Sequence, residues 1–109
     1  MIVKKKTSRQ CWRYGNCVFY ARRILRKYYG KHLPYGLWTL WNKKRIINSR
    51  HAKKGRVAIM ALGFWGHLGI VEKVKGSKIY IREANYFRCR KSIRKGREHE
   101  FKIVGYLNN

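Results

Sequence analysis

The spacing of apolar residues changes its period at Gly55, and this change is what most restricts the fold. Between positions 16 and 29, before Gly55, apolar residues recur every three or four positions, which is typical of an amphipathic helix. After Gly55 the apolar runs are short and several alternate, as in strands. A chain with its helices first and its strands in succession afterwards indicates an α+β domain, with N-terminal helices packed on an antiparallel sheet.

The punctuating residues set the expected boundaries of these elements. Asn16 is a suitable helix N-cap and Gly30 a suitable C′ residue, so Cys17 is expected at the first helical position. A second, shorter helix is expected within 37–48, and residues 75–78 form a credible hairpin turn. Strands are expected at 57–62, 67–74, 78–86 and 101–107. Residues 1–9 are interpreted as a basic tail, and residues 87–99 as a basic loop.

The charge of the chain is extreme for its length. The 109 residues predict a single domain, residues 1–109, and a hydrophobic content of 45% argues against disorder. The 28 Lys and Arg residues stand against four Glu and no Asp, for a net charge of +24. This excess implies a polyanionic partner such as nucleic acid, anionic lipid or an anionic cell wall, and such strong like charge favours a monomer.

No segment of the sequence has the length and hydropathy of a membrane span, for which about 18 apolar residues are needed. The cationic start is not followed by the apolar stretch of a signal peptide, so none is expected.

The three cysteines are Cys11, Cys17 and Cys89, and an odd number is not a disulfide framework. Without a C-x-x-C pair, and with four scattered histidines, they do not form a zinc site. One reactive thiol and two structural or incidental thiols is the simplest interpretation, and a Cys11–Cys89 disulfide stays open. We expect no metal and no other cofactor.

Cys17 and His67 have the positions of a nucleophile and a base. A thiol at a helix N-terminus lies at the positive end of the helix dipole, which stabilises the reactive thiolate. His67 lies at the mouth of an apolar strand that is expected to be central, where it has little packing role. A neutral imidazole there can deprotonate Cys17 and later protonate a leaving amine.

Glu83 is the acid that the strand pattern places in the interior. Alternation puts Glu83 and Asn85 on the face that carries Ile79 and Ile81, where an unpaired carboxylate is costly. Two partners are open: the second ring nitrogen of His67, which Glu83 would orient, or one of the basic residues in a salt bridge. Asn85 could orient the same group or contact substrate. A thiol, an imidazole and an acid are the parts of a thiol-dependent acyl-transfer site.

Four segments of the chain, in order, resemble motifs of the CHAP family (cysteine, histidine-dependent amidohydrolase/peptidase). GNCVFYA at 15–21 resembles G-[QN]-C-[TV]-x-[YF]-[VA], and KGRVAI at 54–59 resembles K-G-D-V-A-V. GHLGIVEKV at 66–74 resembles G-H-V-A-I-V-E-x-V, and IYIREANY at 79–86 resembles I-x-I-x-E-x-N-[YW]. The resemblance extends in order from about Cys11 to Leu107, nearly the whole chain.

The resemblance implies a papain-like α+β fold and cleavage of peptidoglycan, either at the amide that joins glycan to stem peptide or within the peptide cross-links. Many such domains belong to phage lysins or bacterial autolysins. Carried over, Cys17 is the nucleophile, His67 the base, Glu83 the residue that orients the histidine, and Asn85 the polar residue beside it. The backbone N–H of Cys17 would contribute to the oxyanion hole.

Two departures from the family pattern matter. Arg56 stands where K-G-D-V has its acid, so any structural role of that acid is lost or replaced. Some members of the family bind calcium through Asp residues, and because this chain has no Asp, we expect no calcium site.

We therefore expect a peptidoglycan hydrolase, an N-acetylmuramoyl-L-alanine amidase or a cross-link endopeptidase, whose cationic surface concentrates it on anionic wall polymers. It is expected to act at the bacterial cell wall, either phage-encoded and released by a holin or extracellular. A catalytically inactive CHAP-like wall-binding domain is one alternative.

The other alternative is a basic nucleic-acid-binding protein, and we expect adventitious nucleic-acid binding in vitro in any case. Five aromatic residues could stack bases, although no nucleic-acid-binding motif is present. Four of these aromatic residues could equally line a substrate groove or belong to the core. The stacking candidates are Trp12, Trp38, Trp41, Phe64 and Trp65, and all but Trp12 are the groove candidates.

Overall fold

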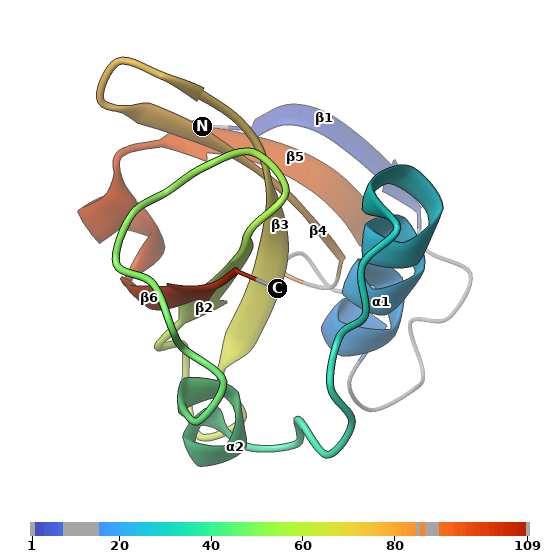
Figure 1. Cartoon of the computed structure of the whole chain (residues 1–109). Coiled ribbons are helices and arrows are strands. Elements are labelled where there is room, and N and C mark those ends of the chain that lie inside the picture. The colour runs from blue at the N-terminus through green and yellow to red at the C-terminus, as the bar shows by residue number, and fades with distance from the viewer. Residues whose placement is uncertain (1, 8–15, 85, 87–89, 109) are drawn as a thin grey trace.

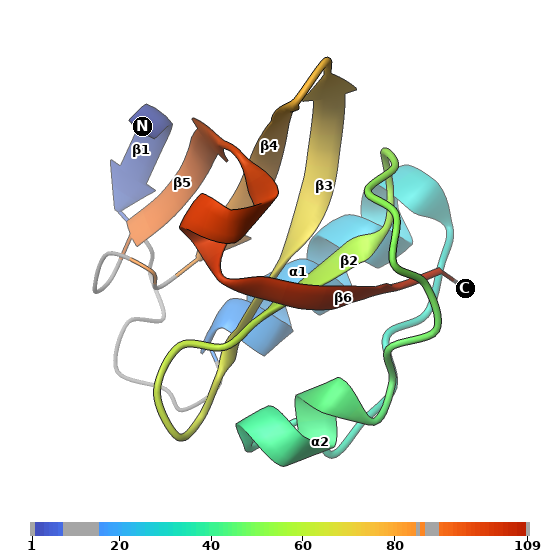
Figure 2. The same cartoon turned by 90° about the vertical axis from the view of Figure 1, so that its left-hand side faces the viewer.

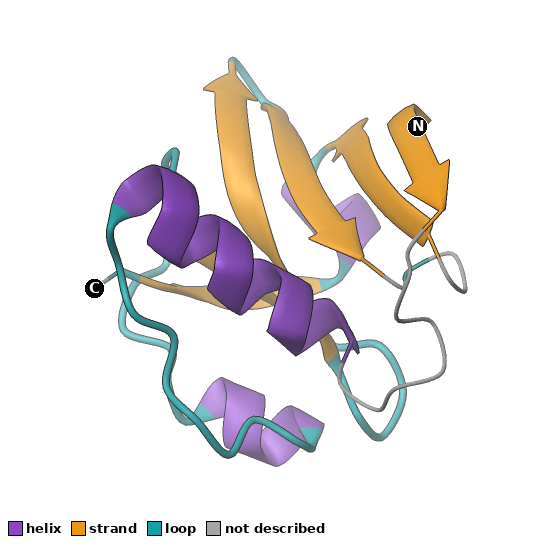
Figure 3. Ribbon diagram, turned by 90° about the vertical axis from the view of Figure 1, so that its right-hand side faces the viewer, coloured by secondary structure: helices purple, strands orange, loops and turns teal. Residues whose placement is uncertain are grey.

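The chain folds into one antiparallel sheet with a long helix across one of its faces (Figures 1 and 3). The computed structural model describes residues 2–7, 16–84, 86 and 90–108. The α+β class that the order of helices and strands predicted is confirmed. The elements are β1 (Ile2–Thr7), α1 (Asn16–Tyr29), α2 (Leu40–Lys44), β2 (Val57–Met60), β3 (His67–Lys75), β4 (Lys78–Ala84), β5 (Arg90–Gly96), the 3-10 helix η1 (Glu98–Phe101) and β6 (Ile103–Leu107).

The six strands lie in the order β1-β5-β4-β3-β2-β6, and every pair is antiparallel. Strands β2 to β5 form a meander, β6 adds to the free side of β2, and β1 adds to the free side of β5. The sheet is strongly twisted, so that β6 runs nearly crosswise to β4 in Figure 2. This meander places the start of β3 and the end of β4 at the same end of the sheet.

Helix α1 has the predicted periodicity and nearly the predicted bounds. It begins at Asn16, so Cys17 lies in its first turn, and it ends before Gly30, which has a φ of +61°. The N–H of Gly30 donates to the Arg26 carbonyl at 3.2 Å, as in a glycine C-cap. Neither α1 nor any other helix in the described ranges is long and apolar enough to cross a membrane.

The sheet buries apolar residues on both of its faces. The first cluster packs α1 against the sheet, and the second lies on the opposite face, where η1 contributes Phe101. The central strands therefore have two dry faces, which explains their short, continuous apolar runs. The first cluster includes Cys17, Val18, Ala21, Leu25, Val57, Ile59, Leu68 and Ile70, and the second includes Ala58, Met60, Val71, Ile79, Ile81, Phe101 and Tyr106.

Two segments that the sequence analysis interpreted as irregular are strands, and those two predictions were wrong. The expected basic tail contains β1, and the expected basic loop of residues 87–99 contains β5 and the start of η1. Both strands are dominated by basic and polar residues, so they give no apolar strand signal. They form because backbone pairing does not require apolar side chains, and lysines are typical of edge strands such as β1. Helix α2 is also shorter than expected.

Arg56 has a structural role of its own at the position where related motifs have an acid. Its Nη1 donates to the Ser49 hydroxyl oxygen and to the His51 carbonyl, each at 2.7 Å. These bonds attach the polar loop before β2 to the start of that strand. Arg56 therefore makes structural contacts of its own at the position of the missing acid.

Gly69→Ala tests the close packing of β3 on β4. A Cβ at position 69 would lie 2.6 Å from Cγ2 of Ile81 and 3.0 Å from the Arg82 carbonyl oxygen. We expect this substitution to lower the free energy of unfolding by about 1–3 kcal/mol, measured by urea denaturation. The control is Gly96→Ala, whose nearest contact is the flexible end of Glu100 at 3.2 Å, and its effect should be smaller. Equal effects at the two positions would contradict the prediction.

Candidate active site

Three of the four predicted site residues meet at one end of the sheet. His67 is the first residue of β3 and Glu83 is the second-last residue of β4, and the N-terminus of α1 lies beside the end of β4 (Figure 3). All three side chains are buried, with exposed fractions of 8% for Cys17, 6% for His67 and 0% for Glu83. Asn85 lies outside the described residues.

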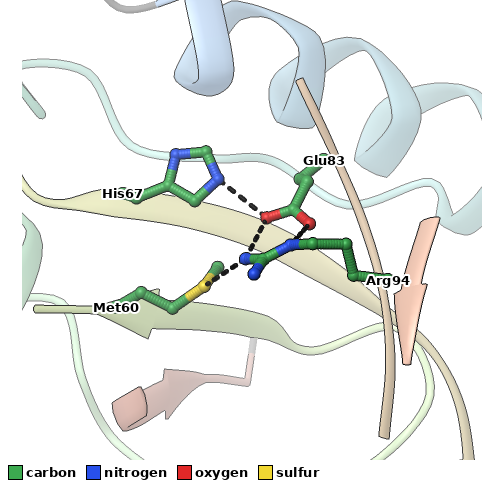
Figure 4. A network of polar contacts seen from close by, with 4 residues as sticks. All are labelled: Met60, His67, Glu83 and Arg94. Carbon is green, nitrogen blue, oxygen red and sulfur yellow. Dashed lines mark hydrogen bonds and ion pairs between the residues drawn. The ribbon is translucent and has the colours of Figure 1, made fainter. Parts of the chain in front are cut away.

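The imidazole of His67 connects the thiol to the carboxylate. Its Nε2 lies 2.8 Å from Oε1 of Glu83, and its other ring nitrogen points away from that carboxylate (Figure 4). The charges of His67 and Cys17 shift each other's pKa, which indicates that the thiol lies close to the imidazole ring. Because Nε2 is taken by Glu83, the nitrogen left for the thiol is Nδ1. The three groups are thus arranged in series, as they are in thiol-dependent hydrolases.

Arg94, on β5, is a second partner of Glu83. Its Nε donates to Oε2 of Glu83, and its Nη2 donates to Oε1 at 2.9 Å and contacts the Met60 sulfur at 3.7 Å (Figure 4). The guanidinium carbon also lies 3.3 Å from the centroid of the Tyr86 ring. The two partners that the sequence left open for Glu83, a histidine and a basic residue, are therefore both present.

Arg94 was not predicted from the sequence, because the strand that carries it was interpreted as a loop. The register pairs Arg94 with Ile81, so its side chain shares the buried face of β4 on which Glu83 lies. The only available signal was the cost of burying Glu83, which requires a cation without saying which of the 28 it is.

Lys43 of α2 is a buried cation that sequence analysis also missed. Its side chain is buried, and Nζ donates to three backbone carbonyls, those of Leu37 at 3.0 Å, Trp38 at 3.3 Å and Trp65 at 2.7 Å. These bonds fasten the segment before α2 to the segment before His67. Among so many lysines, no local signal distinguishes this one.

The electrostatics of the site favour an ionised thiol and a charged imidazole. Burial alone would raise the pKa of Cys17, but the hydrogen bond and charge of His67, the charge of Lys43 and a backbone hydrogen bond from Leu68 outweigh burial and lower it. Burial alone would lower the pKa of His67, but hydrogen bonds to Cys17 and Glu83 outweigh burial and raise it to about 9. The two groups therefore stabilise each other as thiolate and imidazolium.

The pKa values of Glu83 and Lys43 are shifted by burial and by different charged neighbours. Burial alone would raise the pKa of Glu83, and the hydrogen bonds with His67 and Arg94 lower it instead, so the carboxylate stays ionised. Burial lowers the pKa of Lys43, and the charge on Cys17 opposes this shift. The charged groups of the site therefore shift one another's pKa values. In the part of the chain that the structure describes, no group of three or more His, Cys, Asp or Glu side chains could hold a metal ion.

An exposed aromatic rim borders the site. The side chains of Trp38, Trp41, Phe64 and Trp65 are exposed by 62%, 66%, 63% and 52%. Of the three interpretations that the sequence left open for these residues (base stacking, a substrate groove and the core), the one that places them in the core is therefore wrong. Lys43 holds the carbonyls of Trp38 and Trp65, and the Leu40 N–H donates to the Phe64 carbonyl at 3.0 Å. These bonds join the two aromatic segments next to His67.

Paired substitutions test whether Arg94 is the counter-charge of Glu83. Glu83→Gln leaves a buried, unpaired guanidinium, so we expect the free energy of unfolding to fall by about 3–5 kcal/mol. The double variant Glu83→Gln/Arg94→Met should be more stable than Glu83→Gln alone, although it removes more contacts. Urea denaturation of both variants measures this difference. A double variant less stable than Glu83→Gln would contradict the assignment.

Comparison with known families agrees with this geometry. The model of the CHAP domain family matches residues 6–85, a segment that contains Cys17, His67 and Glu83. No curated protein matches the chain. CHAP domains are generally cysteine- and histidine-dependent amidohydrolases or peptidases, and a helix on an antiparallel sheet is consistent with the papain-like superfamily. Because the match covers well over half of the chain, the protein belongs to the CHAP family.

Proposed function

We propose that the protein hydrolyses an amide bond of bacterial peptidoglycan, through a thioester formed on Cys17. The observation that carries this proposal is the buried series Cys17–His67–Glu83, in which the thiol is stabilised as thiolate and the imidazole as imidazolium. The substrate class comes from the family, whose members suggest a peptidoglycan amidase or peptidase.

In the first half of the reaction the Cys17 thiolate attacks the carbonyl carbon of the amide. A carbon–sulfur bond forms and the carbonyl electron pair moves to oxygen. As this tetrahedral intermediate collapses, the carbon–nitrogen bond breaks, and Nδ1 of His67 gives its proton to the leaving amine. The products are a free amine, a thioester on Cys17 and a neutral imidazole.

In the second half the same imidazole acts as a base. Nδ1 of His67 takes a proton from water while the oxygen of that water attacks the thioester carbon. The carbon–sulfur bond then breaks, which releases a carboxylic acid and restores the thiolate. The cycle ends with the charges with which it began.

The N-terminus of α1 supplies a donor for the oxyanion. The first four N–H groups of a helix have no acceptor within the helix, and the N–H of Cys17 is among them. We assign this N–H to the oxyanion of the tetrahedral intermediate, where the positive end of the helix dipole acts in the same direction.

Glu83 orients the reaction without touching the substrate. By accepting the Nε2 proton of His67, it fixes the tautomer and presents Nδ1 to the thiol. Arg94 holds the carboxylate from the other side. We retain Asn85 as a further polar residue of this site, on the basis of the motif alone.

The net charge of +24 supports the bacterial wall as the place where the protein acts. Bacterial walls carry phosphate and carboxylate groups, and these attract a cationic catalytic domain. We therefore propose that the protein acts at the bacterial cell wall, whether it is released from a phage-infected cell or secreted.

Lysis of purified peptidoglycan tests the proposed function. Wild type should clear a suspension of wall fragments, whereas Cys17→Ala should not, because the thioester cannot form. Cys11→Ala/Cys89→Ala is the matched control and should retain activity. Mass spectrometry of the released ends names the bond: a free lactyl carboxylate on muramic acid indicates the amidase, and new ends within the peptide indicate the endopeptidase. Equal clearing by Cys17→Ala and wild type would overturn the mechanism.

The pH profile tests the thiolate–imidazolium pair. The thiolate must be ionised and the imidazolium protonated, so activity should fall on the acid side as Cys17 gains a proton. On the alkaline side, activity should fall near pH 9, as His67 loses its proton.

The substitution Lys43→Met removes a cation that stabilises the thiolate, so we expect the fall of activity on the acid side to move to higher pH. Lys44→Met, an exposed neighbour on the same helix, is the control, and a similar shift in both variants would contradict the role of Lys43.

A further inference from the structure

A cationic pocket lies between α1 and the strands β4 and β5, on the helix side of the sheet. Its volume is about 240 Å³. This is below the roughly 300–1,000 Å³ of pockets that enclose drug-sized ligands, so it can hold one small group. Its basic and aromatic lining residues are Tyr20, Arg23, Lys27, Tyr28, Arg82 and Lys91.

Local periodicity brings these side chains together. Tyr20, Arg23 and Lys27 are three and four residues apart, so they form one stripe along α1. Arg82 alternates with Glu83, so the pleat that buries Glu83 on one face turns Arg82 to the other, and Lys91 lies opposite Ala84. Strand β4 therefore contributes Glu83 to the candidate active site on one of its faces and Arg82 to this pocket on the other.

Within the described part of the chain, three of the four cations of this pocket have no carboxylate partner. Arg82 is paired with Glu72, with Nε 2.6 Å from Oε2 and Nη2 2.8 Å from Oε1, and this pairing raises the pKa of Arg82. Among the described residues, Arg23, Lys27 and Lys91 form no ion pair. Like charges held this close repel one another, so a bound anion would be favourable.

We propose that this pocket binds a phosphate group of a phosphodiester polymer of the bacterial wall. Arginine and lysine together are the usual ligands of phosphate, and the pocket offers both around a rigidly held guanidinium. The choice of a wall polymer rests on the proposed function, because that function places the protein on the wall.

The tyrosines favour this polymer over nucleic acid. Nζ of Lys91 lies 5.4 Å from the centroid of the Tyr20 ring, and Nζ of Lys27 lies 5.4 Å from that of Tyr28. One face of each ring is therefore covered by a cation. Proteins that bind single-stranded nucleic acid stack bases on open aromatic faces, whereas a polymer without bases requires only the cations.

The pocket begins next to the catalytic residues. Tyr20 follows Cys17 by about one helical turn, and Tyr28 lies roughly 16 Å farther along α1 than Cys17. At the strand end, Lys91 pairs with the residue after Glu83. A phosphate polymer bound here runs beside α1 and keeps the attached glycan within reach of the thiolate.

Binding to two kinds of wall tests the proposal. The first wall retains its phosphate polymers, and the second has been stripped of them by hydrofluoric acid. Arg23→Gln/Lys27→Gln/Lys91→Gln is compared with Arg26→Gln/Lys53→Gln/Lys75→Gln, which removes one arginine and two lysines from exposed positions elsewhere. On the polymer-bearing wall the pocket variant should bind at least about 10-fold more weakly than the control variant. The slope of log affinity against log salt should be less steep for the pocket variant than for the control variant, since each lost cation–phosphate contact removes a salt-dependent contribution.

On the stripped wall the two triple variants should bind alike, and both should hydrolyse a soluble glycopeptide at the wild-type rate. The charge-preserving Arg23→Lys/Lys27→Arg/Lys91→Arg should retain binding. Equal losses of binding to the polymer-bearing wall in the two triple variants would overturn the proposal that this pocket binds phosphate. If the pocket variant lost as much affinity for a single-stranded oligonucleotide as for the polymer-bearing wall, the choice of a wall polymer as the ligand would be overturned. If wall binding depended on the pocket residues but the wild-type protein did not hydrolyse peptidoglycan, the proposed phosphate site would be supported and the proposed hydrolase function would be overturned.

Discussion

The arrangement of the site depends on one buried carboxylate. Glu83 has no exposed surface, so its charge is tolerable only because β3 and β5, the two neighbours of its strand, each supply a partner. His67 binds one of its oxygens and Arg94 binds both. The meander and the position of the imidazole are therefore linked: a strand order that separated β3, β4 and β5 would leave Glu83 without a partner and His67 without an orientation.

The chain has only four carboxylate side chains, and each makes a different structural contact. Glu72 pairs with Arg82, Glu98 accepts the Tyr106 hydroxyl at 2.6 Å, and Glu100 accepts the Arg97 N–H at 2.7 Å. Glu83 serves the candidate active site. Four acids cannot neutralise 28 cations, so most of the positive charge is available for an anionic partner. The same composition that leaves few ion pairs within the fold leaves a large excess of positive charge, whose interactions weaken as the salt concentration rises.

Much of the fold was predictable, and the errors have a common cause. Helix α1 and the turn at Gly76, whose φ is +61°, follow from local periodicity and turn chemistry. The two mispredicted strands, β1 and β5, are basic and polar, and only their pairing with neighbours distant in sequence makes them strands. Arg94 was missed for this reason. Lys43 was missed because its role consists of bonds to carbonyls up to 22 residues away.

The sequence by itself determined the class of the fold, the thiol at a helix start and the interior position of Glu83, because periods of 3.6 and 2 residues decide which face a side chain takes. Only the tertiary structure decided which of the 28 cations are buried and what Glu83 binds. It also decided that the aromatic residues beside His67 are exposed. These choices depend on strand order, register and burial, which are set by contacts between residues far apart in the chain, and a local pattern carries no information about them.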